Sequence, residues 1–307
     1  MFSKTQNSRT VGGWTSSAGN CICCGAIISS SDGFCRQCAT PSNLSRAASG
    51  SSNDKSFISV LGASNAGKTV YLGMLLDIIG KDGGNVSGSP KSTFSVNLQE
   101  QVITALENRQ FPEKTPSESD MWNWVHCELA MRERRSVRSL DLISPDLAGE
   151  AIAVEVQQPG TYPIIQHVVR RSSGVMILCD SIRVGQASSG DDLFAMKLAA
   201  YVAQLHGLSP NTPSSQRHDV EPCLAIVLTK CDACPEATKD PTAFAANNLP
   251  RLYEFCRKTF AQHRYFAASV AGNTCVVLDT AKNPHRIPLH IEPRGVVEPL
   301  SWLVTGV

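Results

Sequence analysis

The sequence lacks any long apolar run. No stretch approaches the roughly eighteen uncharged apolar residues of a membrane span, and the first twenty residues contain no apolar core of the kind that a secretory signal needs. The formal net charge of +1 provides no overall basic field that would draw the chain to nucleic acid or an anionic membrane. We therefore expect a soluble, cytoplasmic protein without a membrane partner.

Cysteine, in contrast, is abundant. The chain of 307 residues is 42% hydrophobic, enough for one large domain with an appendage, and five of its twelve cysteines fall between residues 21 and 38. Such clustering in a chain expected to be cytoplasmic favours a metal site over disulfides.

Four of these cysteines form two Cys-x2-Cys pairs with ten residues between them: Cys21, Cys24, Cys35 and Cys38. Two such pairs supply four thiolates that can converge tetrahedrally on one Zn2+ ion, and Gly25 lets the backbone bend beside the first pair. We expect residues 21–38 to form a small zinc ribbon whose metal holds the fold. Cys23 is surplus, either as a bystander or as an alternative ligand.

The rest of the chain divides by composition. We expect residues 1–20 to be a disordered tail, and the Ser-rich residues 39–55 to be a flexible linker. From residue 56 to 307, short apolar runs alternate with helical patterns, which predicts an α/β fold with a mostly parallel sheet and helices on both faces. The expected strands are SFISVLG, WVHCELAM, SVRSLDLIS, GVMILCD, CLAIVLTK and RYFAAS; the expected helices are GKTVYLGMLLDII, DDLFAMKLAAYVAQLHG, and FAANNLPRLYEFCRKTF with a kink at Pro250.

The stretch GASNAGKT, Gly62 to Thr69, directly follows the first expected strand. Its spacing of glycine, four residues, glycine, lysine and threonine is typical of a phosphate-binding loop, in which successive backbone N–H groups face phosphate oxygens at a helix N-terminus. A nucleotide is therefore the expected ligand.

Three later motifs, each after an expected strand, indicate which nucleotide. DLAG offers a carboxylate, Asp146, near a Mg2+ ion and a Gly149 amide that can reach a γ-phosphate. In TKCD, the Asp232 carboxylate can accept hydrogen bonds from N1 and the exocyclic amino group of guanine, a donor pair that adenine lacks, while the Lys230 stem covers the ring. AAS, residues 267–269, places a backbone amide near the guanine carbonyl. Together they favour GTP over ATP.

With these motifs the chain resembles Ras-like P-loop GTPases over residues 56–304. The stretches KTVYLGML, FPEKT, DLAGE and EPRGVVEPLSWLV further resemble bacterial double-GTPase families, which are predicted to act in multi-protein conflict systems such as anti-phage defence. The resemblance implies GTP or GDP as ligand, Mg2+ as cofactor and a protein effector or activator as partner. The zinc ribbon would dock a partner protein, with nucleic acid as the alternative.

The resemblance also implies roles for individual residues. Lys68 would pair with the β- and γ-phosphates, Thr69 would ligate Mg2+, and Asp146 would hold the ion through a water molecule. Thr115 would be the mobile threonine that closes over Mg2+ and the γ-phosphate; the alternative is an ordinary exposed loop residue. The other expected nucleotide contacts are Gly62, Ala63, Ser64, Asn65, Ala66, Gly67, Val70, Gly149, Thr229, Lys230, Asp232, Ser269 and Val270.

Three residues depart from the Ras-like pattern. Ser64 replaces a glycine and would crowd an arginine supplied by a partner. Glu150 stands in place of the glutamine that orients the attacking water, and its charge would repel the γ-phosphate unless neutralised. Thr229 replaces an asparagine, which weakens the expected side-chain contact to the phosphate loop.

These features lead to two alternative functions. The first is a slow GTPase that acts as a molecular switch, with Lys68, Glu150 and Thr115 as its catalytic residues. The second is a GTP-binding scaffold that does not hydrolyse GTP and whose zinc ribbon carries the function.

A further Cys-x2-Cys pair, Cys231 and Cys234, has no second pair nearby, so we expect two ordinary thiols there.

Overall fold

The computed structural model describes residues 19–29, 31–81, 84–132, 136–186, 189–208, 221–278, 282 and 284–305. Within these residues, seven strands form one sheet in the order β4 (Val86–Pro90), β5 (Trp124–Arg132), β6 (Val137–Pro145), β3 (Asp54–Gly62), β7 (Ser172–Asp180), β8 (Cys223–Thr229) and β9 (His263–Ala267). From β6 to β9 all neighbours pair in parallel, whereas β4 and β5 extend the sheet antiparallel. The expected mostly parallel sheet is confirmed.

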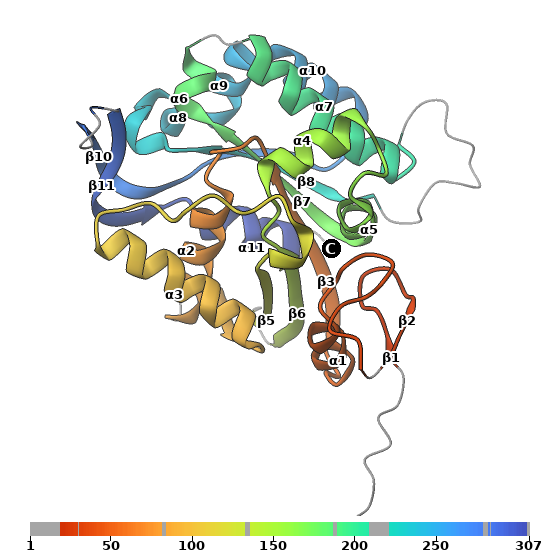
Figure 1. Cartoon of the computed structure of the whole chain (residues 1–307). Coiled ribbons are helices and arrows are strands. Elements are labelled where there is room, and N and C mark those ends of the chain that lie inside the picture. The colour runs from red at the N-terminus through yellow and green to blue at the C-terminus, as the bar shows by residue number, and fades with distance from the viewer. Residues whose placement is uncertain are drawn as a thin grey trace, which may run out of the picture.

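Helices cover both faces of this sheet (Figure 1). In β3, Phe57 and Leu61 enter one buried cluster, while Ile58 and Val60 enter the other, as the alternation of side chains along a strand requires. The second face packs against α2 (Lys68–Gly80), α3 (Thr93–Glu107) and α11 (Val297–Thr305). The first face packs against α4 (Gly149–Gln157), α5 (Pro163–Arg171), α7 (Ser189–Leu205), α9 (Pro241–Asn248) and α10 (Pro250–Thr259).

The helical pattern expected in α7 is found, with Leu198, Tyr201 and Leu205 buried on one face. The kinked helix expected around Pro250 is instead two helices, α9 and α10, separated by Leu249 in a non-helical conformation. Proline lacks a backbone N–H and favours the first turn of a helix, so Pro250 starts α10. Of the helices in the described part of the chain, none has the length and hydropathy that a membrane span requires.

The N-terminal region is folded against the sheet domain. Of the expected tail, residues 1–18 lie outside the described residues, and Gly19–Asn20 form β1, which pairs antiparallel with β2 (Ile27–Ile28). Residues 39–55, expected as a flexible linker, contain a helix, α1 (Ser42–Ser49), in which Leu44 and Ala48 are fully buried. The sequence does not predict α1, because the segment has few apolar residues. Those of α1, Leu44 and Ala48, are buried in an apolar cluster with residues from other parts of the chain.

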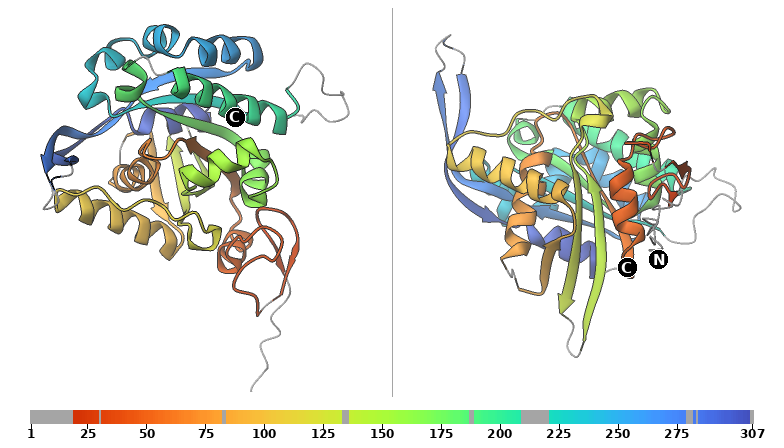
Figure 2. Two further views of the ribbon diagram at one scale, coloured as in Figure 1. Left: turned by 45° about the horizontal axis from the view of Figure 1, so that its top comes forward. Right: turned by 60° about the horizontal axis from the view of Figure 1, so that its bottom comes forward.

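Between β9 and α11 in the chain, β10 (Ser269–Leu278) and β11 (Pro284–Arg294) pair antiparallel and form a two-stranded sheet of their own. The pair extends from the edge of the molecule beside α3 (Figures 1 and 2). No helix or strand is expected from the sequence over residues 270–296.

Candidate nucleotide site and metal centre

The four expected motifs meet at one edge of the sheet. Parallel strands present their carboxyl ends at a common edge, and ligands of α/β proteins bind there. β3 ends at Gly62, β6 at Pro145, β8 at Thr229 and β9 at Ala267, and each motif begins at or just after that point. A cavity of about 400 Å³ opens at this edge.

Its wall contains most of the residues expected to contact nucleotide, together with Thr115 and Glu150. The expected residues on the wall are Ser64, Asn65, Gly67, Lys68, Thr69, Val70, Thr115, Gly149, Glu150, Thr229, Lys230, Asp232, Ser269 and Val270. Gly62, Ala63 and Ala66 belong to the loop but not to the wall, and Asp146 is fully buried behind it.

The phosphate loop depends on two glycines. A Cβ at Gly62 would lie 2.7 Å from the carbonyl oxygen of Leu178, so no side chain fits there. Gly67 adopts φ 88°, a left-handed conformation that turns the chain into α2. The loop thus delivers Lys68 and Thr69 in the first turn of α2.

Lys68 is buried in the loop that it follows. Its Nζ donates hydrogen bonds to the carbonyl oxygens of Gly62, at 3.1 Å, and Ala63, at 2.9 Å. Burial lowers the pKa of Lys68 to about 8, while the negative charge of Asp146 opposes the shift. A phosphate group beside this ammonium would favour its charged form.

Thr69, Thr115 and Asp146 bring three oxygen-bearing side chains together. The hydroxyls of Thr69 and Thr115 lie 2.9 Å apart, and they donate to the Asp146 carboxylate at 3.2 and 3.0 Å respectively. Burial raises the pKa of Asp146 to about 6, against the opposing effect of these hydrogen bonds. An all-oxygen donor set with one carboxylate fits Mg2+. Thr115 is therefore not an ordinary exposed loop residue.

Gly149 and Glu150 lie close to the phosphate loop. A Cβ on Gly149 would come within 2.4 Å of the Ser64 backbone nitrogen, so this contact requires glycine. The Glu150 side chain is 61% exposed, and its carboxylate lies 3.6 Å from Lys114 Nζ in the Thr115 segment. Lys114 thus offers the neutralising charge that a carboxylate near a γ-phosphate needs.

The guanine motif is tied to the same loop. Thr229 Oγ1 donates to the carbonyl oxygen of Ala66 at 2.9 Å, so threonine makes the loop contact that we expected this replacement to weaken. Lys230 has a left-handed φ of 59°, and its Nζ lies 2.7 Å from Asp180 Oδ2. Asp232, in the short helix η3 (Cys231–Ala233), is on the cavity wall.

Several residues of this site are not among those expected from the sequence. Asp180, which holds Lys230, ends the expected strand GVMILCD, and its position at a strand end was a usable signal. Phe111, which comes shortly before Thr115 in the chain, also lines the cavity. Thr274 and Arg286 line the same cavity from β10 and β11, and no sequence motif includes either residue.

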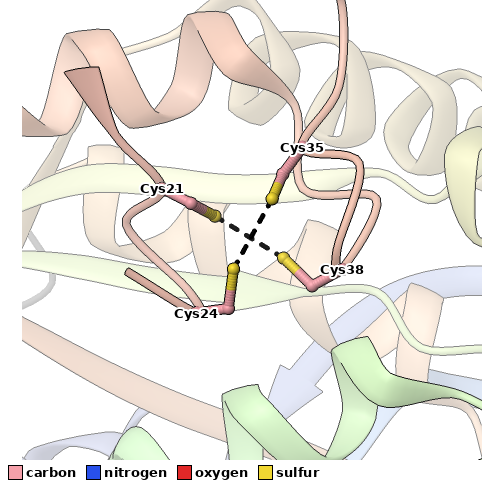
Figure 3. Close-up of side chains that lie close together, drawn as sticks. All are labelled: Cys21, Cys24, Cys35 and Cys38. Atoms are coloured by element: carbon pink, nitrogen blue, oxygen red, sulfur yellow. Dashed lines mark hydrogen bonds between the residues drawn. The ribbon is translucent and has the colours of Figure 1, made fainter. Parts of the chain in front are cut away.

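The four expected zinc ligands also converge (Figure 3). All four Sγ atoms lie within 4.8 Å of one another, and the Cys21–Cys38 and Cys24–Cys35 pairs are each 3.5 Å apart. Four sulfurs bound tetrahedrally to zinc at about 2.3 Å would be about 3.8 Å apart, so the arrangement fits a zinc ion. Within the described residues, these four cysteines are the group whose side chains lie close enough together to hold a metal ion. Cys23 and the pair Cys231 and Cys234 do not belong to this group.

The cysteine cluster is packed into the protein and does not stand apart from it. Cys21, Cys35 and Cys38 are buried in the same apolar cluster as Phe57 of β3 and Ile165 of α5. The backbone N–H of Ile22 also donates to Ser45 Oγ of α1 at 3.1 Å. Zinc at this position would therefore stabilise one side of the sheet domain as well as the ribbon.

A zinc analysis tests the cluster. We expect about one zinc per chain by elemental analysis, and Cys35→Ser should remove nearly all of it and lower the midpoint of thermal unfolding, because one of four ligands is lost. Cys231→Ser is the control, since its thiol donates to Leu228 O at 3.2 Å and lies outside the cluster. Full zinc content in the Cys35→Ser protein would contradict the assignment.

The raised pKa of Asp146 predicts a pH-dependent stability. The folded state binds this proton more tightly than the unfolded state, so the ionised carboxylate destabilises the fold increasingly from about pH 4 and fully above about pH 6. In metal-free and nucleotide-free protein, Asp146→Asn should raise the free energy of unfolding by about 3 kcal/mol near pH 7.5 and by about 1 kcal/mol near pH 4.5. Urea unfolding at both pH values measures these differences.

Asp54→Asn is the control for this measurement, because Asp54 is exposed at the start of β3. The prediction fails if the stability gain of Asp146→Asn is the same at the two pH values.

Comparison with known proteins bears on the phosphate end of the site. Residues 59–198, which contain the phosphate loop, Thr115, Asp146 and Glu150, match the family described as Double-GTPase 1. No curated protein matches the chain. Among solved structures, a nucleolar GTP-binding protein 1 from Plasmodium falciparum is similar at 12% identity and a TM-score of 0.31, over 71% of this chain and 78% of that one. The expected resemblance to double-GTPase proteins is confirmed, with residues 59–198 matching the Double-GTPase 1 family.

Proposed function

We propose that this protein is a Mg2+-dependent, slowly hydrolysing GTPase that acts as a molecular switch in the cytoplasm. The family match supports GTP binding. The observation that carries the rest is the convergence of Thr69, Thr115 and Asp146 beside the phosphate loop, within 3.2 Å of one another. Thr115 belongs to a segment without helix or strand, so ligands at this point would order it, as a switch requires.

The residues of the site divide into three chemical roles. Lys68 and the N–H groups at the start of α2 bind the β- and γ-phosphates. Thr69, Thr115 and Asp146 would hold Mg2+, which neutralises charge on the phosphate oxygens when bound. Glu150, with its charge balanced by Lys114, orients the attacking water.

Slow turnover follows from the charges around the cavity. Transition-state charge in GTPases is stabilised by an arginine supplied in cis or in trans. In the described part of the chain, Arg286 is the arginine that lines the cavity, and it stands with Asp232 at the guanine end. Unassisted hydrolysis should therefore be slow, and a protein activator would accelerate it.

The remaining regions complete the proposal. Residues 56–307 act as the nucleotide-binding domain, and the zinc ribbon of residues 21–38 acts as an adaptor for a partner protein. Ile27 and Phe34 support this adaptor role, because both are apolar side chains exposed on the ribbon. A signalling role in a bacterial multi-protein conflict system rests on the resemblance that the sequence motifs carry.

Nucleotide selectivity tests the proposal first. Wild-type protein should bind GDP and GTP about 100-fold or more tightly than ATP in calorimetric titrations, because Asp232 accepts two hydrogen bonds that adenine cannot donate. Asp232→Ala should lose this preference, and Asp54→Ala, at the opposite end of β3, should keep it. Equal affinity of the wild type for GTP and ATP would rule out the guanine assignment.

Hydrolysis separates the switch from a scaffold that only binds GTP. Single-turnover phosphate release by the wild type should be about 10⁻⁴ to 10⁻² per second and absent in Lys68→Ala. If Glu150 orients water, Glu150→Gln should keep or modestly raise the rate, whereas Glu150→Ala should lower it. Glu118→Ala is the control, because Glu118 is an exposed glutamate close to Thr115 in the chain and outside the cavity wall.

Rates equal to the wild type in both Glu150 variants would remove Glu150 from the mechanism. Wild-type protein that binds GTP but releases no phosphate above the Lys68→Ala level would favour the scaffold. A wild-type rate above about one per second would show a stabilising cation at the phosphate end.

A further inference from the structure

The β10–β11 pair is joined to the nucleotide site at its base. β10 begins at Ser269, the last residue of the segment expected to meet the guanine carbonyl, and it packs against η3, which carries Asp232. The N–H of Cys231 in η3 also donates to Ala268 O at 3.2 Å. The position of β10 is therefore fixed relative to the guanine motif, although the pair forms hydrogen bonds with no other strand of the described chain.

Besides the first three residues of β10, the pair contributes Thr274 and Arg286 to the cavity wall. In the antiparallel register, Thr274 lies opposite Pro288 and Val276 opposite Arg286, so Thr274 and Arg286 are diagonal neighbours on one face. Arg286 Nη1 donates to Thr274 Oγ1 at 2.7 Å, and both residues line the cavity. This hydrogen bond orients a guanidinium at the cavity wall.

Arg286 and Asp232 line the same cavity, and their charges interact. Burial raises the pKa of Asp232, and the positive charge of Arg286 opposes that rise. The phosphate end has its own cation, Lys68, bound to the loop carbonyls. Lys230, the cation within the guanine motif, is paired with Asp180 at 2.7 Å.

We propose that Arg286 is a nucleotide-binding residue that contacts the guanine nucleoside, and that Thr274 positions it. The inference rests on the proposed function, since it needs a guanine nucleotide in the cavity. A planar guanidinium packs well on the face of an aromatic base, and its five N–H donors exceed the one hydrogen bond that Thr274 accepts. Its charge beside Asp232 also favours the ionised carboxylate that guanine recognition requires.

Calorimetric titration of the full-length protein with GTP, GDP and GMP tests this inference. Arg286→Ala should weaken all three nucleotides by the same factor, about 3- to 30-fold, because the contact is made to a part that they share. Arg286→Lys should recover only part of the loss, since lysine keeps the charge but not the planar group. Thr274→Val should cause a smaller loss of the same pattern. Arg294→Ala is the matched control, an exposed arginine on the same strand outside the cavity wall.

Two results would overturn the inference while the wild type still binds GTP. Unchanged affinities in Arg286→Ala would show a surface arginine without contact to nucleotide. A loss confined to GTP would place the guanidinium at the γ-phosphate instead. Failure of the wild type to bind any guanine nucleotide is a separate result, because it would refute the proposed function itself.

Discussion

Parallel pairing of β6, β3, β7, β8 and β9 is the constraint on which the site depends. Strands that run in the same direction end at the same edge, so loops that are distant in the sequence become neighbours there. Thr69 and Asp146 are 77 residues apart, yet their side chains are hydrogen bonded. The helices on both faces make this pairing stable, because each strand of such a sheet buries side chains on both sides.

The site holds opposite charges in a buried setting. Lys68 and Asp146 each pay a desolvation cost, which lowers the pKa of the amine and raises the pKa of the carboxyl. Hydrogen bonds to the loop carbonyls partly offset this cost for Lys68, and hydrogen bonds from two threonine hydroxyls partly offset it for Asp146. Phosphates and a divalent cation would compensate both charges better. The nucleotide-free site is thus arranged to gain stability from its ligands.

Two further segments, the N-terminal cysteine region and the β10–β11 pair, are attached to the sheet domain in different ways. The cysteine cluster and α1 are buried against the face that holds Phe57 and Ile165, at the beginning of β3. The β10–β11 pair instead joins the carboxyl edge, where Thr274 and Arg286 extend the cavity wall. The cysteine region is therefore placed to affect the stability of the fold, whereas the β10–β11 pair is placed to contact a ligand in the cavity.

The sequence by itself determined the class of sheet, the order of the four nucleotide motifs and the four cysteines, because each follows from local spacing: a glycine-rich turn after an apolar run, or paired Cys-x2-Cys. It left Thr115 with two interpretations. Only the tertiary structure decided that Thr115 contacts Asp146, that Pro250 separates two helices, that Leu44 is buried in a Ser-rich segment and that Arg286 lines the cavity. Apart from the break at Pro250, these outcomes depend on contacts between distant segments, which local patterns do not encode.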